Sequence, residues 1–339
     1  MQNFHHLSSS FVFTLSRGVR DDIEQEDEIE SYMRFMEENP HLGLAADEEE
    51  EAYEYDADGN IIVDHSIINY APFAKNFYIE HEEISRLDQA GVDALREKLG
   101  LRVSGPSPLR PVCSFAHLGL DEPLMEAIRK AGYTQPTPIQ AQAVPIAMSG
   151  RDVIGIGKTG SGKTAAFLWP LIIHVMDQPP LKLGDGPIGV ICAPTRELAL
   201  QIYSEAKKLA KVYNLTVVCA YGGGSLWEQQ KACEAGCEIL VCTPGRLIDI
   251  VKKKSTNLRR VTYLVFDEAD KMFNLGFALL FSATFKRRLE RLARDILIDP
   301  IRIIQGELGE VSGIGGTLFF SLSCLCNSLF FVCVFFPWR

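Results

Sequence analysis

The chain has 339 residues, of which 47% are hydrophobic, and it carries a net charge of −10 and nine cysteines. This length and apolar content suffice for one to three domains with a buried core. No secretory signal is visible, and Cys233-x3-Cys237 has no second pair at zinc spacing, so we expect a reduced, soluble intracellular protein without a zinc site there.

The negative charge is concentrated near the N-terminus. Residues 21–58 hold 17 acidic side chains and one basic residue, Arg34. Segments with high net charge and few β-branched residues stay disordered. We therefore predict a mostly disordered acidic arm over residues 1–60. The rest of the chain is mildly basic, so the average charge does not exclude nucleic-acid binding.

Residues 61–114 are predicted to form an N-terminal extension and a linker. One helical stretch covers residues 82–99. Pro106, Pro108 and Pro111 follow it and are typical of a linker.

From Phe115, apolar runs of strand length alternate with amphipathic stretches of helix length. Strands are predicted at 153–156, 189–193, 216–220, 238–242, 263–266 and 279–281, and helices near 163–176, 196–213, 226–235, 245–253 and 286–296. Continuous Val/Ile/Leu runs indicate strands buried on both faces, and the intervening helices imply parallel crossovers. The predicted fold class is therefore α/β, with a doubly wound parallel sheet and a ligand site beyond the carboxyl ends of its strands.

A phosphate-binding loop is predicted between the first of these strands and its helix. The pattern Gly157-x4-Gly162-Lys163-Thr164 lets backbone N–H groups surround phosphate oxygens, and the helix N-terminus adds positive potential. Lys163 would neutralise the β- and γ-phosphates, and the Thr164 hydroxyl would hold Mg²⁺. A glycine-rich turn with a surface lysine is the alternative, and the strand–loop–helix context disfavours it.

Two carboxylates complete the predicted active site. Asp267 and Glu268 directly follow the strand at 263–266. Asp267 would hold Mg²⁺ through water, and Glu268 would orient the attacking water. An acidic cluster is also favourable at the start of a helix, but the upstream loop favours the catalytic interpretation.

Several further motifs occur in one order and together resemble the DEAD-box RNA helicases. They are Gly132-Tyr133-Thr134-Gln135-Pro136-Thr137-Pro138-Ile139-Gln140 with Phe115 upstream, Pro194-Thr195-Arg196-Glu197-Leu198-Ala199, Gly222-Gly223-Gly224, Thr243-Pro244-Gly245-Arg246, Asp267-Glu268-Ala269-Asp270 and Ser282-Ala283-Thr284. The resemblance covers residues 115–305, which implies the first RecA-like lobe of a P-loop NTPase with its Q motif. Residues 17–32, 73–83 and 151–152 resemble the subfamily associated with splicing factor 3b.

The resemblance implies ATP hydrolysis coupled to RNA remodelling, with ATP and Mg²⁺ as cofactors. It implies ATP contacts by Phe115, Gln140, Thr159, Gly160, Ser161, Gly162, Lys163 and Thr164, RNA-backbone contacts by Pro194, Thr195, Arg196, Gly223, Thr243, Pro244, Gly245 and Arg246, and coupling by Asp270, Ser282 and Thr284. Gln140 would pair with the N6/N7 edge of adenine, and Phe115 would stack on the ring. Phe115 as a core aromatic, and Arg196 and Arg246 as braces for their helices, remain open alternatives. A role in mRNA splicing, spliceosomal partners and a nuclear or also cytoplasmic location are further implications.

Three features depart from the family pattern. Gly157 stands where the family usually has Ala, which should loosen the loop slightly. Only eleven residues, 271–281, separate Asp270 from Ser282, fewer than a parallel crossover needs, so the strand before Ser282 is expected to be misplaced. No second lobe follows residue 305, so we expect a truncated form with feeble hydrolysis and no unwinding.

The tail, residues 306–339, has two interpretations. Residues 311–338 contain no charge, and the mostly apolar stretch of about twenty residues from 317 to 336 meets the length test for a bilayer span. No basic residues flank the N-terminal side of this segment, so an aberrant C-terminus is preferred over a membrane anchor. Three hypotheses follow: a helicase lobe, a non-catalytic module that binds RNA or splicing partners, and a membrane-tethered ATP-binding protein.

Overall fold

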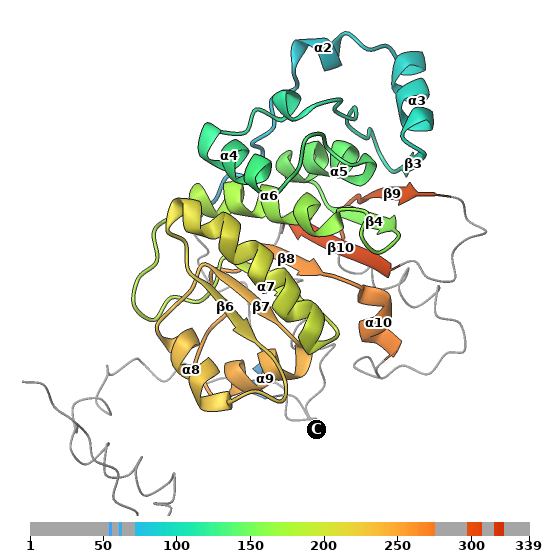
Figure 1. Cartoon of the computed structure of the whole chain (residues 1–339). Coiled ribbons are helices and arrows are strands. Elements are labelled where there is room, and N and C mark those ends of the chain that lie inside the picture. The colour runs from blue at the N-terminus through green and yellow to red at the C-terminus, as the bar shows by residue number, and fades with distance from the viewer. Residues whose placement is uncertain (1–53, 56–60, 63–71, 275–296, 307–314, 322–339) are drawn as a thin grey trace, which may run out of the picture. The chain divides into compact units, whose positions relative to one another are not determined.

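The computed structural model describes residues 54–55, 61–62, 72–274, 297–306 and 315–321 (Figure 1). The chain divides into two units, residues 1–53 and residues 54–339, and every described residue belongs to the second. The predicted acidic arm therefore lies almost wholly outside the described residues. At its predicted boundary, β1 (Glu54–Tyr55) pairs antiparallel with β2 (Ile61–Ile62).

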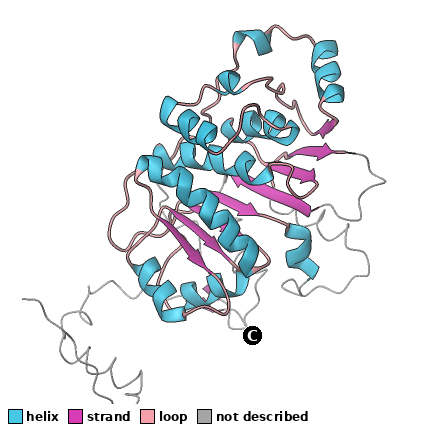
Figure 2. Cartoon of the chain, viewed as in Figure 1, coloured by secondary structure: helices cyan, strands magenta, loops and turns pink. Residues whose placement is uncertain are grey.

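The second unit is built on an eight-stranded sheet with the order β3-β9-β4-β10-β8-β5-β7-β6 (Figure 2). Its strands are β3 (Leu101–Ser104), β4 (Val153–Gly157), β5 (Gly189–Cys192), β6 (Val217–Ala220), β7 (Ile239–Cys242), β8 (Tyr263–Phe266), β9 (Ile301–Gln305) and β10 (Gly315–Ser321). β4 pairs parallel with β9, and β8, β5, β7 and β6 form a parallel run. Five of these six strands, β4 to β8, were predicted, and their parallel pairing is confirmed, whereas β9 was not predicted.

Apolar cores lie on both faces of the sheet because successive strand residues point to opposite sides. The helices around the sheet are α4 (Glu122–Lys130), α5 (Pro138–Met148), α6 (Lys163–Met176), α7 (Arg196–Ala210), α8 (Leu226–Glu234), α9 (Pro244–Lys252) and α10 (Ala269–Asn274), with 3₁₀ turns η2 (Phe115–Leu118) and η3 (Lys211–Tyr213). Ile191 and Val265 belong to the core that the sheet forms with α5, α6 and α7, whereas their neighbours Cys192 and Phe266 belong to the core on the side of α9 and α10. This is the doubly wound arrangement predicted from the buried runs.

The predicted helix at 82–99 is divided in two. α2 (Glu82–Ser85) ends before Asp88, and α3 (Gln89–Lys98) begins after it. The Asp88 carboxylate accepts a hydrogen bond from the Gly91 N–H at 2.8 Å and caps the second helix. Because an N-cap residue has a non-helical backbone, the helix cannot run through this position. The single-helix prediction was therefore wrong at Asp88.

The segment before Phe115 packs on the lobe instead of forming a free linker. β3 pairs antiparallel with β9 and extends the main sheet. Val112 is buried, and its N–H donates to the Ala141 carbonyl at 2.9 Å. The Arg96 guanidinium donates to the Gln142 side chain at 3.0 Å. The sheet and its core thus cross the domain boundary predicted at Phe115.

β10 lies in the middle of the sheet and runs against its neighbours. It pairs antiparallel with β4 on one side and with β8 on the other. β8 pairs with β5 along its other edge, so both edges of β8 are paired with described strands. The strand predicted at 279–281 and the helix predicted at 286–296 lie outside the described residues.

Four of the described cysteines are buried as small apolar side chains. Cys192 and Cys242 are buried in adjacent strands with their sulfur atoms 3.6 Å apart. Cys233 and Cys237 are also buried, and burial raises the pKa of the Cys233 thiol to about 11. A buried thiol of this kind packs as a small hydrophobe.

None of the described helices combines the length and apolarity needed to cross a bilayer. Residues 317–321 of the tail belong to β10, and the rest of segment 317–336, on which the anchor alternative depends, lies outside the described residues.

Candidate active site

The phosphate-binding loop has the backbone geometry that its sequence predicts. β4 ends at Gly157 and α6 begins at Lys163. Gly160 and Gly162 have φ angles of +78° and +92°, a region that L side chains rarely adopt. A Cβ atom at Gly162 would lie only 2.5 Å from the Gln140 amide nitrogen. Glycine is therefore required at this position for both conformation and space.

The Lys163 ammonium lies across the loop. Its Nζ donates to the Gly157 carbonyl at 2.6 Å and to the Lys158 carbonyl at 2.9 Å. Thr164 follows in the first turn of α6 and is half-buried. Both side chains stand at the N-terminus of a 14-residue helix, where the helix dipole favours an anion. A phosphate oxygen would compete with the two carbonyls for the ammonium.

The loop contains a polar atom with unused hydrogen-bonding capacity. The Ser161 hydroxyl is buried without a hydrogen-bond partner among the described residues. A buried polar group without a partner costs about 1–3 kcal/mol. The Ser161 hydroxyl can donate to a phosphate oxygen, so the residues present fit a nucleotide phosphate.

Gln140 joins the Q motif to the phosphate-binding loop. Its Oε1 accepts from the Thr137 N–H at 2.9 Å, and its Nε2 donates to the Gly162 carbonyl at 3.1 Å. The side chain is completely buried. This bracing role was not predicted, because no local signal marks a contact between residues 22 positions apart. Pairing with adenine stays a prediction, for which the amide has a second acceptor lone pair on Oε1 and a second N–H on Nε2.

Phe115 belongs to a buried aromatic cluster. It is 6% exposed and meets Trp169 edge-on, with ring centroids 5.5 Å apart. Trp169 makes a second edge contact with Tyr133 at 5.4 Å. The core-aromatic alternative therefore describes Phe115 in this structure, and stacking on adenine stays a prediction.

A pocket of about 880 Å³ opens beside this aromatic cluster, between α4, α6 and α7. Trp169, Tyr133 and Ala165 line it, and Ala165 directly follows Thr164. Burial raises the pKa of the Glu205 carboxyl at its rim.

Asp267 and Glu268 lie at the end of β8, as predicted. Asp267 is 4% exposed, and its backbone N–H donates to the Cys192 carbonyl at 3.0 Å. Its carboxylate accepts from the Glu268 N–H at 3.0 Å. Glu268 has a φ of +48°, a strained conformation that is frequent at functional sites. An ion pair of 2.9 Å with Lys271, which sequence reasoning missed, holds the Glu268 carboxylate.

The predicted coupling residues are only partly described. Asp270 lies in α10, but its side chain is not described. Ser282 and Thr284 lie outside the described residues. Their coupling role stays a prediction.

The predicted RNA-contacting residues gather at one edge of the sheet. Pro194, Thr195 and Arg196 follow β5, Gly223 follows β6, and Thr243, Pro244, Gly245 and Arg246 follow β7. These three strands are parallel neighbours, so their carboxyl ends meet at the same edge. The sequence motifs are thus brought together as a surface.

Arg196 and Arg246 differ in what they contact. Arg196 is exposed, and its guanidinium lies 4.7 Å above the ring of Tyr221. Arg246 has a largely buried side chain and donates to Gln229 Oε1 at 2.9 Å and to the Gly224 carbonyl at 3.3 Å. Arg246 therefore braces the glycine loop, whereas Arg196 remains accessible to a ligand.

Two residues that support this surface were missed by sequence reasoning. Gln229 Oε1 also accepts from the Tyr221 N–H at 3.0 Å and so links α8 to the loop after β6. Tyr221 supplies the ring beneath Arg196. The Thr243 hydroxyl accepts from the Gly222 N–H at 3.2 Å. No local pattern marks Gln229 or Tyr221, because their partners come from other loops.

Comparison with known proteins gives consistent results. Residues 137–293 match the family model for DEAD/DEAH box helicases. The chain is 60% identical to the chicken ATP-dependent RNA helicase DDX42 over 325 residues, covering 88% of this chain and 34% of the relative. The human ATP-dependent RNA helicase DDX42 is 59% identical, with 87% and 34% covered. The chain thus spans about a third of the length of these curated relatives.

Solved structures share the fold. The crystal structure of the yeast DEAD-box splicing factor Prp28 matches with a TM-score of 0.60 at 31% identity, covering 66% of this chain and 58% of that protein. The RNA helicase Prp28 from Chaetomium thermophilum bound to ADP matches with a TM-score of 0.60 at 36% identity, covering 68% and 60%. The predicted RecA-like fold is thereby confirmed.

Proposed function

This chain belongs to the DEAD-box ATP-dependent RNA helicase family and contains the first lobe of that architecture, and from this premise we propose that it binds ATP with Mg²⁺ and the backbone of RNA. In the whole protein, ATP hydrolysis at this site would be coupled to RNA remodelling. The observation that carries the proposal is the phosphate-binding loop, in which Gly162 cannot accept a side chain and Lys163 stands at a helix N-terminus.

The residues of the site divide the chemistry between them. ATP supplies the phosphoanhydride bond whose cleavage would drive RNA remodelling. The backbone N–H groups of Gly160 to Thr164 would bind phosphate oxygens, and Lys163 would exchange its two carbonyl partners for them. Thr164 and the buried Asp267 would hold Mg²⁺. Glu268, oriented by Lys271, would position the attacking water.

Nucleotide binding to the purified chain tests the phosphate site. We expect Lys163→Ala to weaken ATP binding about 100-fold, because hydrogen bonds to charged groups contribute about 1.5–3 kcal/mol. Lys158→Ala is the matched control, since it removes the same charge from an exposed position of the same loop. Equal losses in both variants would contradict the assignment of Lys163.

Turnover separates catalysis from binding. We expect Glu268→Gln to retain ATP affinity within about twofold and to abolish RNA-stimulated phosphate release, because the amide cannot polarise water as a carboxylate does. Loss of binding together with turnover would show that Glu268 supports the fold and not the reaction.

RNA binding is tested by a second pair of variants. Arg196→Ala should weaken binding to a single-stranded RNA about fivefold to tenfold, whatever its sequence, because backbone contacts carry no base information. Lys98→Ala removes an equal charge at the end of α3 and should change little. A loss that depends on RNA sequence would contradict a backbone contact.

A second function, binding ATP and RNA without turnover, is favoured by one observation. Both neighbours of β8 are occupied, by β5 and by the antiparallel β10. The strand predicted at 279–281, which should lead into Ser282 and Thr284, lies outside the described residues. Binding of both ligands to the unaltered chain without any RNA-stimulated phosphate release would support this function over the first.

We further propose spliceosomal partners and a nuclear location, with a cytoplasmic pool also compatible. The support is the likeness to the yeast protein described as a DEAD-box splicing factor, and the resemblance to the subfamily associated with splicing factor 3b. Proximity labelling in living cells tests both proposals. Recovery of cytoplasmic ribosomal proteins without nuclear splicing proteins would overturn them.

A further inference from the structure

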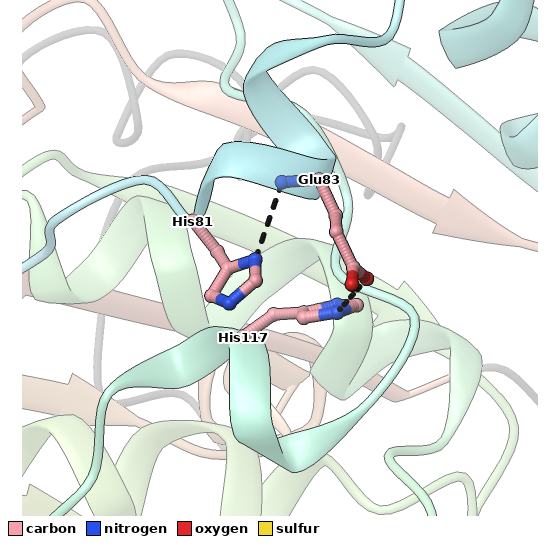
Figure 3. Close-up of side chains that lie close together, drawn as sticks. All are labelled: His81, Glu83 and His117. Carbon is pink, nitrogen blue, oxygen red and sulfur yellow. Dashed lines mark hydrogen bonds and ion pairs between the residues drawn. The ribbon is translucent and has the colours of Figure 1, made fainter.

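Two imidazoles and a carboxylate meet outside the candidate active site (Figure 3). They are His81, Glu83 and His117, and one ligand atom from each lies within 4.8 Å of the others. His81 and Glu83 belong to the start of α2, whereas His117 lies in η2. The cluster therefore joins the segment that precedes the lobe to the 3₁₀ turn that contains Phe115.

The three side chains are already oriented toward one another. His117 Nε2 lies 3.1 Å from Glu83 Oε2, and the His81 and His117 ring centroids are 4.9 Å apart. The His117 side chain is only 10% exposed, so its ring has little freedom to turn away. His81 and Glu83 are exposed, which leaves the cluster open to solvent ions.

In both imidazole rings, Nδ1 is the nitrogen that accepts a hydrogen bond from a backbone N–H. His81 Nδ1 accepts from the Glu83 N–H at 3.2 Å, and His117 Nδ1 accepts from the Cys113 N–H at 3.2 Å. In Figure 3 the Nε2 side of His117 lies at the Glu83 carboxylate. The nitrogen available to a ligand is therefore Nε2 in each ring.

We propose that His81, Glu83 and His117 form a binding site for a divalent transition metal of the Zn²⁺ class. Two imidazole nitrogens and one carboxylate oxygen are a recurrent Zn²⁺ ligand set, with bonds of about 2.0–2.2 Å and a fourth position open to water. Two ligand atoms of a tetrahedral site with such bonds are about 3.3 Å apart. The 3.1 Å between His117 Nε2 and Glu83 Oε2 is close to that spacing.

The hydrogen bonds at Nδ1 limit the affinity of this site. A neutral ring that accepts at Nδ1 carries its proton on Nε2. Metal binding moves that proton to Nδ1 and breaks one backbone hydrogen bond per ring. Each such bond contributes about 0.5–1.5 kcal/mol. We therefore expect a dissociation constant on the order of micromolar, weaker than a structural zinc site.

Metal binding would connect two parts of the fold. The Arg110 guanidinium already pairs with Glu80 at 2.9 Å next to the cluster. A metal bridging α2 and η2 would add a second link between the preceding segment and the turn that begins at Phe115. Because a ligand that binds only the folded state stabilises it, Zn²⁺ should raise the unfolding temperature.

Calorimetric titration of ZnCl₂ into the metal-free chain tests the proposal. A Cys113→Ser background removes an exposed thiol while keeping the backbone N–H that holds His117. We expect one site of micromolar affinity, no competition by a tenfold excess of MgCl₂, and a higher unfolding temperature with Zn²⁺. Absence of Zn²⁺ binding at millimolar concentration would overturn the proposal.

Two variants locate the site, and one serves as control. His81→Asn keeps an N-cap acceptor for α2 and removes the imidazole, and Glu83→Gln removes the carboxylate charge. Each should weaken Zn²⁺ binding at least tenfold without lowering stability in the absence of metal. Glu82→Gln makes the same change on the same helix, where the carboxylate pairs with Arg86, and should leave binding unchanged. Equal Zn²⁺ affinity in the unaltered chain and all three variants would show that the metal binds at another site, and the proposal would fail.

Cobalt provides a spectroscopic check on the ligands. Co²⁺ bound by imidazole and carboxylate gives weak visible bands without the intense charge-transfer band of a thiolate ligand. We expect the weak bands in the unaltered chain and their loss in His81→Asn. A strong thiolate band that survives in His81→Asn would show that cysteines bind the metal, and the proposal would fail.

Discussion

The two sides of the candidate active site are held in different ways. On the phosphate-binding side, contacts between neighbouring elements within residues 137–164 suffice: Gln140 bonds to Gly162, and Lys163 bonds to carbonyls of its own loop. On the acidic side, Asp267 and Glu268 depend on β8, whose link to β4 is the antiparallel strand β10. Phosphate binding is therefore a local property of the chain, whereas joining the two sides depends on a distant segment.

The largest expected effect comes from breaking β10. Leu318 pairs with Ile154 of β4 and with Phe266 of β8. Proline at this position removes an N–H in the middle of a sheet and leaves a carbonyl unpaired. We expect Leu318→Pro to lower the free energy of unfolding by about 3 kcal/mol or more, measured by urea denaturation. Leu318→Ile keeps the N–H and is the control; equal midpoints for both would show that the sheet does not need β10.

The pH dependence of stability tests the packing of α6 against β8, where His174 is buried. Burial lowers the pKa of His174 to about 4, and the imidazole bonds to Thr262 at 2.8 Å. An unfolded histidine has a pKa of about 6.5, so the unfolded state binds more protons between these values. Stability is therefore complete above about pH 6.5 and falls toward pH 4, by about 3 kcal/mol over the full window.

The variant His174→Gln isolates this contribution. The difference in unfolding free energy between the unaltered chain and the variant should shrink as the pH falls from 7 to 5, because glutamine does not titrate. A difference that stays constant over this range would show that His174 does not remain neutral in the folded state.

A substitution at Gln140 tests whether this residue only braces the phosphate-binding loop or also contacts adenine. Gln140→Leu leaves the Thr137 N–H and the Gly162 carbonyl without partners, and we expect a loss of about 2 kcal/mol in stability. If Gln140 only braces the loop, ATP and GTP affinities should fall by the same factor. If it also reads adenine, the ATP affinity should fall more. Competition binding with both nucleotides distinguishes the two outcomes.

The smallest expected effect concerns Gly157. A Cβ atom there would lie 3.1 Å from the Ser161 hydroxyl and 3.6 Å from Gln305, and its φ is not in the left-handed region. Gly157→Ala should stabilise the chain by about 0.5 kcal/mol, because alanine restricts the unfolded backbone. ATP affinity should change less than twofold. A clear loss of affinity would mean that the loop needs the freedom of glycine here.

The sequence was informative wherever one local pattern decides the structure. The continuous apolar runs located β4, β5, β6, β7 and β8, and the glycine spacing located the phosphate-binding loop. The sequence did not predict strands whose position depends on pairing with segments distant in the chain. β3 alternates polar and apolar residues as an edge strand, Arg302 interrupts the apolar run of β9, and β10 has no recognisable pattern. Their places depend on which sheet edges other strands leave open.

In the candidate active site, too, residues marked by local motifs were predicted, whereas residues that act through contacts between distant segments were not. Lys163, Asp267 and Arg196 lie where their motifs predict, because each directly follows its strand or begins its helix. Gln229, Tyr221 and Lys271 were not predicted, because they act through side chains that only the folded chain brings near. Arg246 shows that a motif residue can be a brace, which its sequence position alone left undecided.

The position of β10 also has a consequence for the order of folding. It pairs with β4, which precedes it by roughly 160 residues in the chain. Contacts of such long sequence separation form slowly, because a large loop must close first. β8, β5, β7 and β6 lie within residues 189–266 and can assemble as one parallel group. β4 pairs with β9 and β10, and both follow it by roughly 150 residues or more. We therefore expect the joining of β4 to this group, through β10, to limit the rate of folding.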